Sequence, residues 1–384
     1  MLRHRFVNLQ SATLRIGAER FRQRRCPATW AAGLALLAAC AVTPNLHATV
    51  IPFFGVQAQQ WMLSNGGMKM DYDWVRDRFV IQYQYGSIPP RYATIDLTTQ
   101  AFAHLASTNG MHYETLLTVL PSPWAGYQQG TTFVPRGGGG EIYAIDPSGA
   151  PVTTFATGLP GGGAGPTNYS TVRRDDFGVA NNDLFYCNEG TGHVVRVNAS
   201  GNPVWTTMLR RPDSSPARPE AMLVLGSNPR WGPYQNHLLV GENDVVTYNY
   251  LVDPGTGAWA PMNPPLGQVI GGTAESFRIY PFSGGNLALY LSLYNGSAST
   301  IWQLTNLGAI PNLQPGDLFV ARETVLGGEV WHVYFDPQNQ LVAQQVVSIS
   351  GDGYLEDMVF APVPEPSSAV LLWAALSAAL LRRR

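Results

Sequence analysis

Lysine is almost missing from this sequence. Lys69 is its single lysine, and it lies within residues 49–362. Cysteine is equally scarce. Cys26 and Cys40 lie near the N-terminus, and Cys187 stands alone further along the chain, so no disulfide can form within residues 49–362. The run 184–187 around Cys187 is apolar, which favours a small buried side chain over a nucleophile.

The motifs of several catalytic classes are also missing. The sequence contains no HExxH, GxSxG, CxxC or GxxxxGK[ST], so it lacks the signatures of zinc proteases, α/β-hydrolases, thiol oxidoreductases and phosphate-binding loops. The glycine runs 137–140 and 161–163 do not lead into a helix, and we interpret them as loops. Five histidines are scattered without ligand-type spacing and are interpreted as strand or loop residues: His104, His112, His193, His237 and His332.

Positive charge is scarce in the middle of the chain. Seven arginines and one glutamate precede residue 49, and three arginines and one glutamate follow residue 362, so residues 49–362 keep 14 basic and 24 acidic residues, a net charge of −10. Nucleic-acid binding needs a cationic surface, and this balance argues against it. The same charge is compatible with cation binding or simply with solubility.

The N-terminus has the pattern of an export signal. Residues 1–25 hold the seven arginines, residues 30–42 form a short apolar run, and small residues follow. This order predicts a signal peptide spanning 1–48, cleaved after Ala41 or after Ala48. The run 37–40 also fits a lipoprotein signal, in which Cys40 would be acylated.

The C-terminal segment 363–384 has three parts. A proline-rich lead-in resists helix formation and ends the globular part. An uncharged apolar run over 367–381 follows, and its 15 residues are fewer than the roughly 20 that span a bilayer comfortably. Three arginines close the chain and would stay in the cytoplasm. The residues that carry this pattern are Pro364, Glu365, Pro366, Arg382, Arg383 and Arg384.

This tail resembles the PEP-CTERM sorting signal of exported bacterial proteins. The resemblance covers only these 22 residues. It implies recognition at Pro364-Glu365-Pro366 by a membrane enzyme called exosortase, with transient anchoring in the inner membrane through the apolar helix. Proteins with such tails are typically linked to exopolysaccharide or biofilm matrix. Such a tail is a sorting signal. It does not define the activity of residues 49–362, which are called the body below.

Between residues 49 and 362 the sequence reads as repeated β-hairpins. Helix signals are nearly absent, and glycine and proline separate runs rich in Val, Ile, Leu, Tyr and Phe. Equivalent first-strand positions recur at spacings of 53, 52, 54, 50 and 30 residues: Val80, Phe133, Phe185, Leu239, Leu289 and Phe319. Spacings near 50 fit four-stranded propeller blades. The last is too short for a blade, so either the ring is irregular there or the last unit is displaced.

We therefore predict an all-β fold, a six-bladed β-propeller over 49–362 with five or seven blades as alternatives. A signal helix and a hydrophobic sorting helix flank it. The repeat unit resembles NHL and SMP-30-type propeller repeats across about 79–360. Some relatives in that broad class are metal-dependent lactonases or phosphotriesterases and others only bind, and no catalytic motif carries over.

Three glutamates supply the sharpest site hypothesis. Glu220, Glu275 and Glu356 each open a segment that reads as an inner strand, so their carboxylates are expected to converge on the central channel. Like charges brought together either hold one another protonated or require a cation. The functional interpretation is a metal or substrate site at the channel mouth. The alternative is that each glutamate caps loop amides.

Other candidates have equally plain alternatives. Asp175, Asp176 and Asp352 could bind Ca²⁺, although turn chemistry explains such aspartates equally well. Four tryptophans in loop-like segments could stack on sugar rings or serve propeller packing: Trp74, Trp124, Trp231 and Trp259. We predict no cofactor, with Ca²⁺ or another divalent cation as the alternative.

The functional expectation combines these elements. The protein is expected to be an exported, cell-envelope or extracellular β-propeller that acts as a binding or matrix component. Its expected partners are an exosortase-type enzyme, polysaccharide or envelope matrix, and the membrane before processing. The enzymatic alternative is a metal-dependent, lactonase-like propeller hydrolase with an acidic channel site. We favour the non-enzymatic role.

Overall fold

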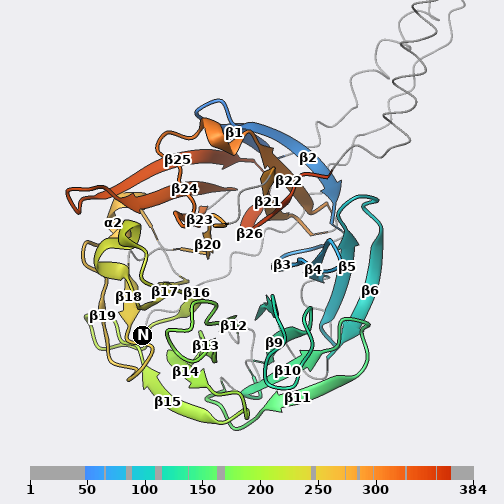
Figure 1. Ribbon diagram of the computed structural model, residues 1–384, viewed down its shortest axis with the longest axis vertical. Helices are drawn as coiled ribbons and strands as arrows, with labels where there is room; N and C mark the ends of the chain where they lie inside the picture. The colour runs from blue at the N-terminus through green and yellow to red at the C-terminus, as the bar shows by residue number, and fades with distance from the viewer. Residues whose placement is uncertain are drawn as a thin grey trace, which may run out of the picture. The chain divides into compact units, whose positions relative to one another are not determined.

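The fold is a closed ring of antiparallel sheets (Figure 1). The computed structural model describes residues 48–364, except 65, 84–88, 109–114, 137, 162–168, 244–247, 273, 283–285, 297, 325–326 and 352. Strands in these residues form six sheets of four or five strands each, so the protein is an all-β, six-bladed β-propeller. The six-bladed prediction is confirmed, and the five- and seven-bladed alternatives are wrong.

Blades 1 to 4 follow one another along the chain. Blade 1 consists of β3 (Met70–Asp73), β4 (Arg78–Tyr83), β5 (Arg91–Asp96) and β6 (Phe102–Ser107). Blade 2 consists of β8 (Thr118–Val119), β9 (Thr132–Arg136), β10 (Glu141–Ile145) and β11 (Val152–Ala156). Blade 3 consists of β12 (Ser170–Arg174), β13 (Leu184–Asn188), β14 (His193–Val197) and β15 (Pro203–Met208), with β7 (Thr115–Leu116) parallel to β12. Blade 4 consists of β16 (Pro219–Val224), β17 (Leu238–Glu242), β18 (Asn249–Val252) and β19 (Trp259–Pro261).

Blades 5 and 6 are interleaved. Blade 5 consists of β20 (Ser276–Ile279), β23 (Leu318–Thr324), β24 (Gly327–Phe335), β25 (Leu341–Ser350) and β1 (Thr49–Pro52). Blade 6 consists of β26 (Tyr354–Pro362), β21 (Leu287–Tyr294), β22 (Thr300–Thr305) and β2 (Gln57–Leu63). The chain thus leaves blade 5 after one strand, forms a hairpin of blade 6, returns to blade 5 and then supplies the inner strand of blade 6.

This interleaving explains the short last spacing of the sequence repeat. Leu289 lies on β21 and Phe319 on β23, which are the second strands of blades 6 and 5. All six repeat positions lie on the second strands of their blades, whereas the sequence pattern predicted first strands. Only 30 residues separate the last two because one hairpin was inserted into the other blade. Of the two alternatives given for the short spacing, the structure therefore favours an irregular ring over a displaced last unit.

The N-terminal strands close the ring. β1 pairs with β25 at the outer edge of blade 5, and β2 pairs with β22 at the outer edge of blade 6. β26 therefore shares a sheet with β2 without pairing to it directly. Trp61 of β2 contacts Phe79 of blade 1 and Tyr290 of blade 6 edge-on, with ring centroids 5.4 and 5.3 Å apart. This aromatic cluster fastens the last blade to the first.

The same kind of turn recurs at the end of the third strand in five of the six blades. One acceptor side chain ends or directly follows the third strand of each of blades 1 to 5, and its Oδ1 atom accepts backbone N–H groups two to four residues later, at 2.7 to 3.1 Å. These residues are Asp96, Asp146, Asn198, Asp253 and Asp336. Such side chains hold the tight turn into the fourth strand. In blade 6 the fourth strand comes from the N-terminus instead.

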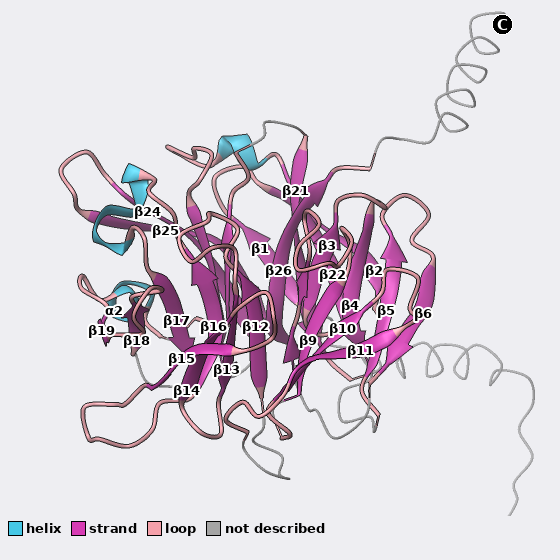
Figure 2. Cartoon of the chain, turned by 60° about the horizontal axis from the view of Figure 1, so that its bottom comes forward, coloured by secondary structure: helices cyan, strands magenta, loops and turns pink. Residues whose placement is uncertain are grey.

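Helix is confined to short connections (Figure 2). Among the described residues these are α2 (Leu266–Ile270), η2 (Pro229–Tyr234) and η3 (Leu307–Ala309). No helix in the described ranges is long and apolar enough to cross a bilayer. The predicted signal and sorting helices lie outside the described residues, apart from their ends at Ala48 and at 363–364.

Candidate functional site

The innermost strands of the six blades surround the central channel (Figure 1). These are β3, β8, β12, β16, β20 and β26, and neighbouring members contact one another around the ring. Glu220 lies in β16 and Glu356 in β26, and Glu275 directly precedes β20. The prediction that these three glutamates open inner strands was therefore sound, and the ring brings them together.

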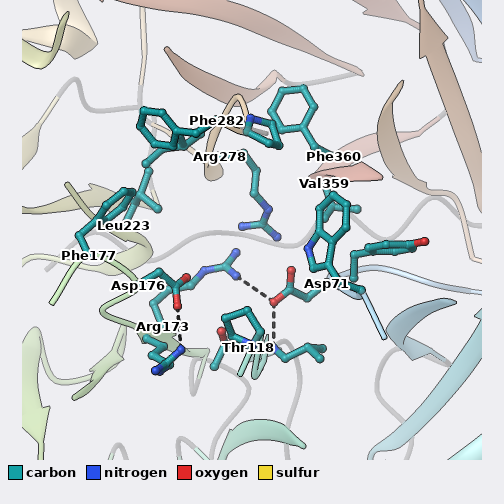
Figure 3. Close-up of a pocket in the computed structure, with 17 residues that line it drawn as sticks. Asp71, Thr118, Arg173, Asp176, Phe177, Leu223, Arg278, Phe282, Val359 and Phe360 are labelled. Carbon is teal, nitrogen blue, oxygen red and sulfur yellow. Dashed lines mark hydrogen bonds and ion pairs between the residues drawn. The ribbon is translucent and has the colours of Figure 1, made fainter. Parts of the chain in front are cut away.

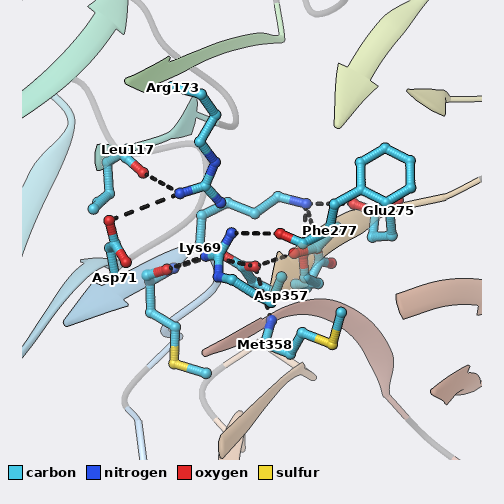
Figure 4. Close-up of polar contacts among 12 residues, drawn as sticks. Lys69, Asp71, Leu117, Arg173, Glu275, Phe277, Asp357 and Met358 are labelled. Carbon is cyan, nitrogen blue, oxygen red and sulfur yellow. Dashed lines mark hydrogen bonds and ion pairs between the residues drawn. The ribbon is translucent and has the colours of Figure 1, made fainter. Parts of the chain in front are cut away.

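The three carboxylates converge on the side chain of Lys69. Lys69 directly precedes β3 and is fully buried. Its Nζ atom lies 3.3 Å from Oε1 of Glu220 and 3.5 Å from Oε2 of Glu356, and it forms an ion pair with Glu275. It also donates to the backbone oxygen of Glu356 at 2.8 Å. Figure 4 shows the ammonium reaching across the channel to Glu275.

The cation among the glutamates is thus an ammonium supplied by the protein. Within the described residues, no three or more His, Cys, Asp and Glu side chains are arranged to hold a metal ion. The metal assignment for Glu220, Glu275 and Glu356 stays a prediction, and the geometry favours the Lys69 interpretation. The sequence signal was the single lysine among 14 basic residues of the body.

Next to this cluster lies Asp357, which is also fully buried. Its carboxylate accepts the backbone N–H of Met70 at 3.0 Å, the hydroxyl of Ser276 at 2.5 Å and the guanidinium of Arg278 at 3.1 Å. Arg278 in turn donates to the backbone oxygen of Met70 at 2.9 Å. These bonds connect blades 1, 5 and 6 at the closure of the ring (Figure 4).

A pocket of about 460 Å³ occupies the same channel (Figure 3). Every innermost strand contributes to its wall, as shown by Asp71, Thr118, Arg173, Leu223, Arg278 and Val359. Asp71 follows Lys69 by two residues, and Arg278 follows Glu275 by three. At about 3.3 Å per residue, the pocket therefore lies roughly 7 to 10 Å further along the channel than the Lys69 cluster.

The pocket holds two carboxylates whose ionisation is disfavoured. Burial raises the pKa of Asp71 to about 6, although Arg278 and the backbone N–H of Val119 act in the opposite direction. Desolvation raises the pKa of Asp176 to about 7, although its side chain is 52% exposed and Arg174 lies 3.3 Å away. Both pKa values are thus shifted upwards, and the shift of Asp71 has the firmer physical basis because its side chain is only 18% exposed.

Three arginines line the same cavity. Arg173, Arg174 and Arg278 are each more than nine-tenths buried. Arg173 donates to the backbone oxygen of Leu117 at 3.2 Å and lies 3.7 Å from Asp71, in both cases through Nη1. The lining thus carries three positive and two negative side chains inside a body whose net charge is −10.

Aromatic side chains also line the pocket and keep part of their surface exposed. Trp74 is 43%, Phe177 36% and Phe282 55% exposed, and all three line the pocket. Of the four tryptophans predicted as sugar-stacking candidates, only Trp74 has this position. Trp231 is buried. Trp124 and Trp259 are half-buried and pack edge-on against aromatic rings, as in ordinary blade packing.

The remaining predicted residues serve the fold. Cys187 is fully buried between blades 3 and 4, and burial raises the pKa of its thiol to about 12, so the prediction of a small buried side chain is confirmed. Asp175 accepts the backbone N–H groups of Phe177 and Ala180 at 3.0 and 2.5 Å, which favours turn chemistry over Ca²⁺ binding. Asp352 lies outside the described residues, as do Glu365, Pro366 and Arg382–Arg384.

The histidines that the structure describes do not gather at the channel. His332 is buried in blade 5 and its Nε2 lies 2.7 Å from Asp317, while His104 contacts the hydroxyl of Tyr83 at 3.0 Å. His237 contacts the backbone oxygen of Gln235 at 2.7 Å. His193 opens β14, and burial lowers its pKa. His112 lies outside the described residues.

Sequence reasoning missed most of the pocket. Asp71, Arg173 and Arg278 did not stand out, because they lie on three strands that are far apart in the sequence and share no motif. The signal that could have found them is their register. Arg278 comes three residues after Glu275, the acid at the start of an inner strand. Asp71 comes two residues after Lys69, the single lysine.

Among the comparisons with known proteins, only the one with solved structures finds similar chains. No family model matches the sequence, and no curated protein matches it. Among solved structures, virginiamycin B lyase from Staphylococcus aureus with Quinupristin is 13% identical, with a TM-score of 0.42 over 76% of this chain and 88% of that one. A protein of unknown function from Bacteroides caccae is also 13% identical, with a TM-score of 0.42 over 77% and 86%.

A nidogen/laminin complex also contains a similar chain. It is 8% identical, with a TM-score of 0.44 over 78% of this chain and 86% of that one. At such low identities and TM-scores, these likenesses carry no functional argument. The class of this protein, a six-bladed β-propeller with a channel pocket, is established by its own sheets.

Proposed function

We propose that this protein is an exported cell-envelope β-propeller that acts as a binding or matrix component, with its ligand in the channel pocket. The observation that carries the proposal is the convergence of all six innermost strands on one cavity with buried arginines and exposed aromatic faces. A volume of about 460 Å³ suits a ligand of one or a few sugar rings.

The arrangement supports binding because its polar groups are held in place before any ligand arrives. Arg278 is fixed by Asp357 and by the backbone of β3, and Asp71 is fixed by the N–H of Val119 at 2.9 Å. A site that is already ordered loses little conformational freedom on binding. Aromatic faces such as that of Trp74 add apolar contact area at low entropic cost.

The location of the protein is the second part of the proposal. Export through the N-terminal signal and sorting at Pro364-Glu365-Pro366 by an exosortase-type enzyme would place the propeller in the envelope or outside the cell. Arg382–Arg384 would hold the apolar tail in the inner membrane before processing. Polysaccharide or envelope matrix is then the partner within reach. The support for this part is the sequence resemblance of the tail.

Hydrolysis remains the second candidate function, and one observation favours it. Asp71 and Asp176 line the same pocket, and both have pKa values raised towards neutrality. Carboxyl groups tuned in this way can act as general acid and base. A hydrolase would cleave its ester, lactone or glycan ligand and lose turnover in Asp176→Asn, whereas a binding protein would return the ligand intact.

Co-sedimentation with matrix polysaccharide from the producing cells tests the binding function. Trp74→Ala should weaken binding at least about fivefold, because a ring-stacking contact is worth roughly 1 kcal/mol. Phe54→Ala is the matched control, since Phe54 is equally exposed at 43% but does not line the pocket. The proposal fails if the native protein does not bind the polysaccharide, or if both variants bind like the native protein.

A further inference from the structure

The arginines of the pocket point to the chemical class of the ligand. Arg173 uses only Nη1 towards the protein, and its buried Nε atom has no acceptor among the described residues. Arg174 likewise uses only Nη1, towards Ser122 and Asp176. Both side chains are more than nine-tenths buried, so these N–H donors are held in the pocket wall without partners from the described chain.

Such an arrangement is costly without an anion. A buried donor that lacks an acceptor forfeits its hydrogen bond to water, and the cost is larger for a charged group. Arg278 adds a third guanidinium on the opposite side, and Figure 3 shows it directed at the cavity. Asp357 and Asp71 neutralise Arg278 and Arg173 in part, at 3.1 and 3.7 Å. The lining still carries one more positive than negative side chain.

We propose that the pocket binds an acidic saccharide, with the carboxylate of a uronic-acid ring placed between Arg173 and Arg278. This inference rests on the binding function proposed above and names its ligand class. Guanidinium groups bind carboxylates through charge-assisted hydrogen bonds. The ring face packs on Trp74, and the ring hydroxyls donate to Asp71 and Asp176.

A saccharide fits the pocket better than a small inorganic anion. A free phosphate would fill only a fraction of about 460 Å³ and would leave the exposed faces of Trp74, Phe177 and Phe282 without a role. An apolar carboxylic acid would use those faces but not the two carboxylates that accept hydroxyl groups. The combination of guanidinium, carboxylate and aromatic groups matches a ring that carries both an acid and hydroxyls.

The test uses the matrix polysaccharide of the producing cells before and after chemical reduction of its carboxyl groups to alcohols. Reduction preserves the rings and linkages and removes only the charge. The native polysaccharide should bind at least about tenfold more tightly than the reduced form, as expected for a charge-assisted contact of roughly 1.5 kcal/mol or more. Equal binding of both forms would overturn the inference and leave the binding function intact. No binding of the native form would overturn both.

Two variants connect this difference to Arg173. Arg173→Gln should reduce binding of the native polysaccharide about tenfold and leave binding of the reduced form nearly unchanged. Arg173→Lys keeps the charge and should lose less. A thermal unfolding curve for each variant checks the fold. If Arg173→Gln weakens both polysaccharide forms equally while remaining folded, Arg173 does not contact the acid group and the inference is wrong.

Discussion

Lys69 is the residue at which blades 1, 4, 5 and 6 meet. Its ammonium is the cation for carboxylates that lie 151, 206 and 287 residues away in the sequence. A buried ion pair adds little stability over a well-packed apolar substitute, but removing one partner leaves uncompensated charge inside the protein. The cluster therefore matters more through the damage caused by losing one member than through the strength of its contacts.

We expect Lys69→Met to lower the free energy of unfolding by about 3 to 5 kcal/mol, because three buried carboxylates lose their common cation. Urea denaturation at neutral pH measures the effect. The double variant Lys69→Met, Glu275→Gln should lose at least about 1 kcal/mol less free energy of unfolding than the sum of the losses in the two single variants, because contacting residues are coupled. Strictly additive effects would show that Lys69 and Glu275 do not interact.

Asp71 should make stability depend on pH. Its pKa is raised from 3.8 to about 6 by burial, so the folded protein holds this proton at pH values where the unfolded chain has lost it. The free energy of unfolding therefore falls as pH rises from about 4 to about 6. Asp71→Asn cannot ionise, and its stability relative to the native protein should improve by about 2 to 3 kcal/mol between about pH 4 and about pH 7.

Asp213→Asn is the control for this experiment. The side-chain hydrogen bond from Ser215 lowers the pKa of the exposed Asp213, so its loss should act in the opposite direction, as a small deficit at neutral pH. Denaturant midpoints measured across this pH range would give both curves. Parallel curves for Asp71→Asn and the native protein would show that Asp71 ionises as readily in the fold as in the unfolded chain.

At the scale of elements, β2 is the strand on which closure depends. It reaches blade 6 from the other end of the chain, and half-buried Trp61 contacts Phe79 and Tyr290 in two different blades. A closed ring removes the exposed strand edges of an open sheet. Losing contacts here should free the N-terminal strands before the rest of the propeller unfolds.

Trp61→Ala should cost about 3 kcal/mol, the lower end for truncating a large core aromatic, because the side chain is only half-buried. Limited proteolysis should then cleave within residues 49–63 faster than in the native protein. Trp259→Ala is the matched control, since Trp259 is also half-buried and packs on Tyr250 of its own blade. Equal cleavage of the N-terminal strands in both variants would contradict a special role of Trp61 in closure.

At the scale of the whole molecule, the proposed sorting and binding functions use separate parts of the chain. The channel pocket uses residues between 71 and 360, whereas the proposed sorting signal begins at Pro364. Changes in the tail should therefore alter where the protein is found without altering what it binds.

Replacing Pro364-Glu365-Pro366 by alanines should preserve export and block processing, because the proposed export signal lies at the N-terminus and stays unchanged. The protein should then stay in the inner-membrane fraction. Deleting residues 364–384 should instead release it. If the deleted form stayed in the membrane, acylation of Cys40 would be the better explanation, and loss of fatty-acid labelling in Cys40→Ala would decide the matter.

The sequence by itself determined the repeat and therefore the fold. Alternating apolar runs at spacings near 50 residues require four-stranded units, and six equivalent positions predict six blades. It also placed Glu220, Glu275 and Glu356 at inner strands, since an acid at the start of each apolar run is visible in one dimension. The apolar surroundings of Cys187 were enough to predict its burial. Each of these features can be recognised from the order of residues along the chain, without knowing which segments meet in space.

Only the tertiary structure decided which segments meet. Nothing in the sequence shows that the hairpin β21–β22 joins blade 6 while β20 stays in blade 5, because a strand pattern is the same whichever sheet it enters. The partner of the three glutamates was hidden for the same reason. Lys69, Arg173 and Arg278 lie about 100 residues apart, and only closure of the ring brings them into one channel. The buried charges of the pocket are therefore a property of that closure, whereas the blades are a property of the local pattern.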